Sequence, residues 1–272
     1  MNLYWSNAGI FPNEGDISRY DFRDRVESAA KAGFTGIGLW HTDLEHILFN
    51  RTLQEMKLIL DDNGMKYLEL EFIADWFLDG GRKVESDNRK RRLFEASAAL
   101  NAKHVKIGDF YNSPYVMPQL VESFAALCKE AEDYGATIGF EFMASAMLHT
   151  LKDSLTMVES AGAKNGGVIV DIVHVVNLGI TYDEISAIPL QYLINVELND
   201  GALAGSRLYD PSRARRFCGE GDFDIKGFIA AVRKTGYSNP WAVEVFSKEL
   251  TDLPLDTLNH QAFDTTLAEF ED

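Results

Sequence analysis

The segment Gly167-Val168-Ile169-Val170-Asp171 is a short apolar run that ends on an acidic residue. Three further runs in the second half of the chain have the same form: Thr137–Glu141, Leu193–Glu197 and Trp241–Glu244. Buried parallel strands are typically apolar runs of this length, and the carboxyl ends of parallel strands meet at one end of a barrel. We therefore expect the four carboxylates to converge at the open end of a single barrel.

Converging carboxylates repel one another, and each loses several kcal/mol of hydration energy when it is buried. A divalent cation removes this conflict. Any one of these acids is equally well explained as a solvated loop residue just past a strand, but for all four that explanation requires a coincidence. The sequence thus predicts a metal site whose ligands are Glu141, Asp171, Glu197 and Glu244.

Composition limits the class of protein. The chain has 272 residues, and α/β barrels typically contain about 250. The net charge of −16 argues against non-specific nucleic-acid binding and docking on anionic lipid, because both rely on Lys and Arg. The chain has two cysteines and no Cys-x-x-Cys motif, and its start has no signal-peptide pattern. No apolar run approaches the ~20 residues of a membrane span. These features predict a cytoplasmic protein.

Strand-like and helix-like patterns alternate along the whole chain. The predicted strands are Leu3–Ser6, Gly36–Trp40, Lys66–Phe72, His104–Ile107, Thr137–Glu141, Val168–Asp171, Tyr192–Leu198 and Trp241–Phe246. The predicted helices lie near Tyr20–Ala32, Arg51–Asn63, Asn88–Leu100, Pro118–Tyr134, Leu151–Gly162, Tyr182–Ala187, Ile225–Thr235 and Leu255–Glu269. Glycines that can cap helices, at positions 33, 64, 135 and 236, precede strands. This rhythm predicts a single (β/α)8 TIM barrel over residues 1–272, without a domain boundary.

An open, doubly wound sheet is the alternative arrangement of these units. Closure is favoured because the units number eight and because polar candidates follow many different strands, not one switch point. The first helix also lacks the Gly-x-Gly-x-x-Gly motif of a dinucleotide site.

Two kinds of catalytic candidate follow from the strands. Asp171 ends the sixth strand and His174 comes three residues later in a predicted loop, which pairs a carboxylate with an imidazole that can move a proton. A helix-capping Asp and a packed His would explain that pair equally well. Glu141 and Glu244 lie between aliphatic or aromatic neighbours, where an unpaired charge is hard to explain, so they are the firmest candidates.

Other residues are candidates for substrate contact. Glu69 and Glu71 share one face of the third strand, and Glu71 is nearer the open end. Lys106 ends the fourth strand, where it either brings a positive charge to the open end or forms a salt bridge. Trp40 ends the second strand and His41 follows it. For both residues, contact with a substrate and packing within the protein are alternative roles that the sequence does not distinguish.

Together these residues resemble the sugar phosphate isomerase/epimerase family, which has a xylose-isomerase-like TIM barrel. The matching features are Glu141 ending the fifth strand, Asp171-x-x-His174 after the sixth, Glu244 ending the eighth, and Gly219-Glu220-Gly221-Asp222 with Arg215 four residues ahead of it. The resemblance spans essentially the whole chain.

One departure concerns the seventh strand, where the family usually has Val-His-x-x-Asp with the His as a metal ligand. Here Val196 is followed by Glu197, with Asp200 in the last position. Either Glu197 replaces the His, or the metal site is weakened. With Glu197 the ligand set is all oxygen, which favours Mn²⁺ or Mg²⁺ over Zn²⁺. This departure and the charge also argue against the His-rich, zinc-dependent DNA-repair branch of the fold.

The resemblance implies proton removal from carbon next to a carbonyl, through a metal-stabilised enediolate. We expect a metal-dependent isomerase or epimerase acting on a keto-sugar or related polyol. Glu141 and Glu244 would be the acid/base pair, His174 would orient a hydroxyl or carry a proton, and Arg215 would contact the substrate. The alternatives are a lyase or dehydratase acting on a keto-sugar, 3-keto-glycoside or keto-cyclitol, and a non-catalytic barrel that binds carbohydrate or a partner. Homo-oligomers and a partner subunit both stay open.

Overall fold

The structure is a computed structural model that describes residues 2–6, 17–203, 215–247, 250 and 252–271. Its eight strands are parallel, follow chain order and close into a barrel. They are β1 (Leu3–Trp5), β2 (Gly36–Trp40), β3 (Tyr67–Ile73), β4 (His104–Ile107), β5 (Ile138–Glu141), β6 (Gly166–Asp171), β7 (Leu193–Leu198) and β8 (Trp241–Val243). Pairing of Leu3 with Trp241 joins the first strand to the last. The predicted closed (β/α)8 barrel is confirmed.

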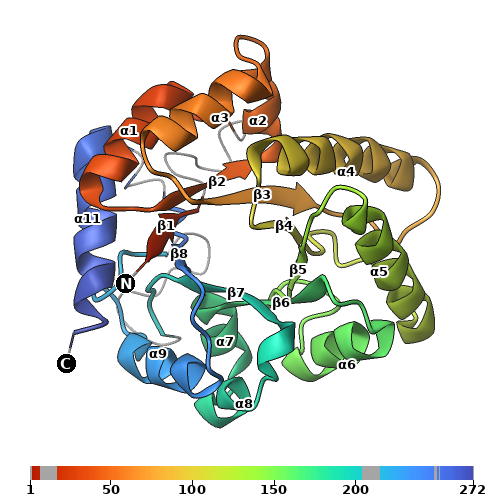
Figure 1. Cartoon of the computed structure of the whole chain (residues 1–272). Helices are drawn as coiled ribbons and strands as arrows, with labels where there is room; N and C mark the ends of the chain where they lie inside the picture. The colour runs from red at the N-terminus through yellow and green to blue at the C-terminus, as the bar shows by residue number, and fades with distance from the viewer. Residues whose placement is uncertain (1, 7–16, 204–214, 248–249, 251, 272) are drawn as a thin grey trace.

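Helices form a ring around the strands (Figure 1). The labelled ones are α1 (Phe22–Ala32), α2 (His41–Leu48), α3 (Leu53–Asp62), α4 (Gly81–Leu100), α5 (Met117–Glu132), α6 (Leu151–Ala161), α7 (Ile172–Leu178), α8 (Tyr182–Ser186), α9 (Ile225–Lys234) and α11 (Leu255–Ala268), with a 3₁₀ turn at Leu190–Tyr192. Thr52 and Glu55 form a capping box that begins α3. Gly33 ends α1 in the left-handed conformation, at φ 112°. The other three predicted cap glycines also have positive φ. None of the described helices is long and apolar enough to cross a bilayer.

Two helices lie where the sequence predicted loops. α2 begins at His41, directly after β2, and α7 begins at Ile172, directly after β6, so the prediction that His174 lies in a loop was wrong. Asp171 caps α7, because its side chain accepts a hydrogen bond from the backbone N–H of Val173. α4 begins at Gly81 and not near Asn88. Ion pairs one helical turn apart, such as Lys90 with Asp87 at 3.0 Å, stabilise its polar start.

The apolar core lies between the barrel and the helices. Leu120, Phe124 and Leu127 of α5 are buried in it, and so are the outward-facing strand residues Val105 and Ile107. Alternate residues along each strand point into the barrel, and in this chain many of them are polar. In most barrels of this type the interior is filled by branched apolar residues. These buried polar residues include Tyr4, Ser6, Glu69, Glu71, His104, Lys106, Asn195 and Glu197. The candidate site is therefore the part of this polar interior that lies at the carboxyl ends of the strands.

Candidate active site

The structure brings the four predicted carboxylates together. One oxygen from each of Glu141, Asp171, Glu197 and Glu244 lies within 4.8 Å of the others, and all four residues are buried. Glu141 and Asp171 are the last residues of β5 and β6, Glu197 is the last but one of β7, and Glu244 directly follows β8. Parallel register produces this convergence, because Asp171 pairs with Glu197 and Glu197 with Ala242, two residues before Glu244.

Asp171 is held in place by two donors on one oxygen. Its Oδ1 accepts hydrogen bonds from the Val173 N–H at 2.9 Å and from Asn199 Nδ2 at 2.8 Å. Its Oδ2 lies 3.0 Å from Arg215. The sequence interpretation did not assign Asn199 this role, although alternation on β7 places it on the same face as Glu197.

Glu197 has one paired oxygen and one open oxygen. Its Oε1 accepts hydrogen bonds from Lys106 Nζ at 2.7 Å and from Asn195 Nδ2 at 3.2 Å. Its Oε2 is buried and has no hydrogen-bond partner among the described residues. Burial, followed by the nearby charge of Glu244, raises the pKa of Glu197 well above its ordinary value. A buried carboxylate oxygen without a donor fits a cation ligand, because leaving it unpaired is costly.

Lys106 lies inside the barrel, with its side chain completely buried. Its Nζ is 2.6 Å from Glu244 Oε1, 2.7 Å from Glu197 Oε1 and 3.1 Å from Glu71 Oε2. Glu141 and Glu69 lie farther from it, at 3.8 and 3.9 Å. Burial alone would lower the pKa of Lys106, but the surrounding carboxylates, first Glu197 and then Glu244, raise it well above its ordinary value. Of the two predicted alternatives, the structure shows the salt bridge.

Arg215 and His174 contact the other side of the carboxylates. The Arg215 guanidinium donates a hydrogen bond to Glu244 Oε2 in addition to facing Asp171. His174 Nε2 lies 3.3 Å from Glu141 Oε1, while its Nδ1 accepts a hydrogen bond from the Ala144 N–H at 3.4 Å. The proton of neutral His174 is therefore on Nε2, facing Glu141. Although burial opposes it, the charge of Lys106 and then the His174 hydrogen bond hold the pKa of Glu141 at about 2.

Trp40, Phe72 and Phe110 form an aromatic cluster near the same end of the barrel. The Trp40 and Phe72 rings stack at 5.7 Å with an interplanar angle of 22°, and the Phe72 and Phe110 centroids are 4.3 Å apart. His41 lies beside this cluster, and its Nδ1 accepts a hydrogen bond from the Phe72 N–H at 3.4 Å. Burial, helped by the charge of Arg89, lowers the pKa of His41 to about 3. His41 is thus buried beside the cluster, and substrate contact by Trp40 and His41 stays a prediction.

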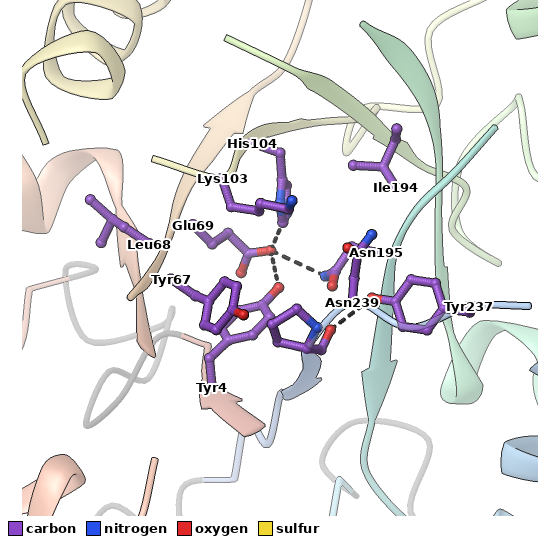
Figure 2. Close-up of a pocket in the computed structure, with 11 residues that line it drawn as sticks. Tyr4, Tyr67, Leu68, Glu69, Lys103, His104, Ile194, Asn195, Tyr237 and Asn239 are labelled. Carbon is purple, nitrogen blue, oxygen red and sulfur yellow. Dashed lines mark hydrogen bonds and ion pairs between the residues drawn. The ribbon is translucent and has the colours of Figure 1, made fainter. Parts of the chain in front are cut away.

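A second polar network occupies the opposite end of the barrel. Figure 2 shows Glu69 at its centre: Oε2 accepts a hydrogen bond from the Tyr4 hydroxyl at 2.8 Å and lies 2.7 Å from His104 Nε2. Against burial, Lys106 and then His104 hold the pKa of Glu69 at about 2. The cavity beside this network measures only about 10 Å³, the size of one water position. This end of the barrel is thus a filled support and not a substrate pocket.

Ser6 links the two ends. Its hydroxyl lies 2.7 Å from Glu69, 3.2 Å from Glu71 and 3.4 Å from Glu244. The predicted placement of Glu71 above Glu69 on one face of β3 agrees with these contacts. The sequence interpretation assigned no role to Ser6 or to His104, although alternation with Tyr4 and Lys106 is the signal that places them inside the barrel.

Comparison with known proteins gives matches along most of the chain. The sequence matches the family described as xylose isomerase-like TIM barrel over residues 26–265. It is 27% identical over 235 residues to a 3-dehydroshikimate dehydratase of Pseudomonas aeruginosa, and the match covers 82% of this chain and 36% of that protein. The chain therefore spans about a third of the length of that curated relative.

Solved structures agree on the fold. A xylose isomerase-like TIM barrel/4-hydroxyphenylpyruvate dioxygenase fusion protein superimposes with a TM-score of 0.87 at 22% identity, over 100% of this chain and 43% of that one. The IolI protein with a bound zinc atom also gives 0.87, at 18% identity, over 99% of this chain and 98% of that one. At such identities these two structures support the fold alone.

Proposed function

Because the chain belongs to the xylose isomerase-like TIM-barrel family, we propose that it is a divalent-metal-dependent enzyme that removes a proton from carbon next to a carbonyl. The observation that carries this proposal is the set of four buried carboxylates, each with an oxygen within 4.8 Å of the others. Such a set is costly to bury without a cation, and a barrel carries its chemistry at this end of its strands.

The donor set fits a divalent ion. The residues that would hold it are Glu141, Asp171, Glu197 and Glu244, and Glu197 Oε2 is a buried acceptor without a donor among the described residues. A set made only of oxygens favours Mn²⁺ or Mg²⁺. When bound, such an ion acts as a Lewis acid that polarises a carbonyl and makes the neighbouring C–H more acidic.

The protein's own residues have separate tasks in this proposal. Glu141 and Glu244 approach the substrate from different strands and accept or return the carbon-bound proton. His174, whose Nε2–H faces Glu141, carries a proton or orients a substrate hydroxyl. Arg215, which contacts Asp171 and Glu244, also contacts a substrate oxygen. Trp40 covers one side of the open end and contacts the substrate ring.

Among the possible outcomes, we propose dehydration of a cyclic β-hydroxy ketone. In this reaction a base takes the proton from the carbon next to the carbonyl, the β-hydroxyl leaves with a proton as water, and a carbon–carbon double bond forms. The relative that supports it is the 3-dehydroshikimate dehydratase, whose match covers 82% of this chain. Isomerisation or epimerisation at the same carbon, also expected from the sequence, needs only return of the proton and stays a prediction.

The test uses the purified chain with Mn²⁺, 3-dehydroshikimate and, separately, a ketohexose, in deuterated water with NMR detection. We expect loss of water from 3-dehydroshikimate to give a dihydroxybenzoate, while deuterium exchange on the ketose without loss of water would indicate the isomerase alternative. Glu244→Gln should abolish either reaction, whereas Glu95→Gln, at an exposed position, should not change it. Absence of both reactions, with no bound metal, would favour the non-catalytic barrel.

A further inference from the structure

We propose that the Lys106 ammonium occupies a built-in second cation position, so that the acidic barrel interior holds one divalent ion and not two. This inference rests on the proposed function, because it takes the first cation position to be the divalent site of Glu141, Asp171, Glu197 and Glu244. Lys106 is then a positioning residue that sets how many ions bind and which oxygens remain for the ion.

The first argument is the coordination of the ammonium. An ammonium group has three donors and no acceptor. Lys106 Nζ meets carboxylate oxygens of three residues on or next to three different strands: Glu244 Oε1 at 2.6 Å, Glu197 Oε1 at 2.7 Å and Glu71 Oε2 at 3.1 Å. All three donors are therefore used inside the protein, and the group does not reach solvent. Three converging carboxylates around one point are what a second metal ion would require.

The second argument is that the two oxygens of Glu197, and likewise the two of Glu244, have different surroundings. Glu197 uses Oε1 for Lys106 and leaves Oε2 without a donor, and Glu244 uses Oε1 for Lys106 while Oε2 faces Arg215. Each carboxylate thus gives one oxygen to Lys106 and has a second oxygen that Lys106 does not use; we call the place of the ammonium the inner position and that of the proposed divalent ion the outer position. Two-metal sites hold their ions about 3.5–4 Å apart, a separation that carboxylates of this kind can bridge. In this chain the inner of the two positions is filled by Lys106.

The third argument concerns charge. Glu197 adds a negative charge at the position where the family usually has a neutral His ligand. The Lys106 ammonium, 2.7 Å away, compensates for this charge. A tethered ammonium supplies a single charge and is not removed by chelators. In the metal-free protein the ammonium then offsets one of the three negative charges of Glu71, Glu197 and Glu244, whereas the outer ion is exchangeable.

Metal stoichiometry tests the inference. Each protein is folded with excess Mn²⁺ and desalted, and bound manganese is counted by native mass spectrometry and elemental analysis. We expect one ion in the wild type and two in Lys106→Met. Adding Glu71→Gln, which removes an inner ligand, should return the count to one. Lys103→Met, which removes an exposed lysine charge from the same strand region, should leave it at one.

The controls separate this inference from the proposed function. Lys106→Arg keeps the positive charge and should still bind one ion. If Lys106→Met does not fold even with Mn²⁺, the same comparison uses Lys106→Gln, whose amide can still donate to a carboxylate. An equal count in the wild type and the uncharged variant, or two ions in the wild type, would overturn the inference. A wild type without bound metal would instead refute the proposed function, whereas a gain of one ion in the variant would still support the inner position.

Discussion

Replacing Gly108 by Ala tests whether the end of β4 sets the position of the aromatic cluster. Gly108 follows β4, and a methyl group there would lie 2.5 Å from Phe72 Cζ, 3.0 Å from Met143 Cε and 3.1 Å from the Glu141 carbonyl oxygen. The terminal methyl of Met143 can move at little cost. The Phe72 ring moves only at a cost, because it is buried and contacts the rings of Trp40 and Phe110.

The size of the effect follows from these distances. Contacts of a methyl carbon become ordinary at 3.4 Å, so the Phe72 ring and the backbone at Gly108 must separate by about 1 Å, and the Glu141 carbonyl must shift by about 0.3 Å. Overpacking of this kind typically costs about 1–3 kcal/mol of unfolding free energy. Part of the shift falls on Glu141, and we therefore also expect weaker Mn²⁺ binding.

Urea denaturation of Gly108→Ala measures the loss, and Gly81→Ala is the matched control. Gly81 begins α4, no atom lies within 4 Å of its added methyl group, and we expect a change within about 0.5 kcal/mol. In a double-mutant cycle, Phe72→Leu should reduce the cost of Gly108→Ala, because leucine lacks the ring atom that the methyl group meets. A Gly108→Ala protein as stable as the Gly81→Ala control, or strictly additive effects in the cycle, would refute the steric argument.

Three further predictions concern the site and its support. Glu197→Gln should raise the Kd for Mn²⁺ by about tenfold or more in calorimetry, because a charged ligand is lost, and an unchanged Kd would reduce the ligand set to three. His41→Asn keeps an acceptor for the Phe72 N–H but does not titrate. The ordinary pKa of histidine is 6.5, and that of His41 in the folded protein is about 3. At pH values between these two, His41 binds a proton in the unfolded wild type but not in the folded one. Wild-type unfolding free energy should therefore fall as the pH is lowered from 7 to 5, relative to His41→Asn, by up to about 1.4 kcal/mol per pH unit, and urea midpoints showing a constant difference would contradict this. In an alignment of the family, Glu at the position of Glu197 should occur together with Lys at that of Lys106, and equal frequencies of this Lys beside Glu and beside His would argue against their coupling.

The barrel and its four converging acids could be predicted from the sequence because both depend on local patterns. Each apolar run ending in an acid marks a strand and its end, and parallel strands then bring the ends together. The two helices that were missed give weaker local signals. α7 contains Ile172, Val173, Val175 and Val176, β-branched residues that have low helix propensity. It forms because Asp171 caps it and because Ile172 and Val175 are buried.

The role of Lys106 could not be predicted in the same way. A lysine at the end of a strand is compatible with substrate contact and with a salt bridge, and local sequence does not distinguish them. Its contacts with Glu71, Glu197 and Glu244 depend on the relative register of strands from both halves of the chain. The same is true of Asn199, which directly follows β7 and donates a hydrogen bond to Asp171 at the end of β6.

The charges inside the barrel connect folding with cation binding. Six buried carboxylates (Glu69, Glu71, Glu141, Asp171, Glu197 and Glu244) face the side-chain cations Lys106 and Arg215. If every group is ionised and the histidines are neutral, the excess is four negative charges, and a divalent ion removes half of it. The remaining charge lies on carboxylates that accept hydrogen bonds, such as Glu69 with Tyr4 and Ser6. A barrel filled with apolar side chains has no such excess charge. In this chain, the carboxylates that fill the barrel interior include those that would bind the ion.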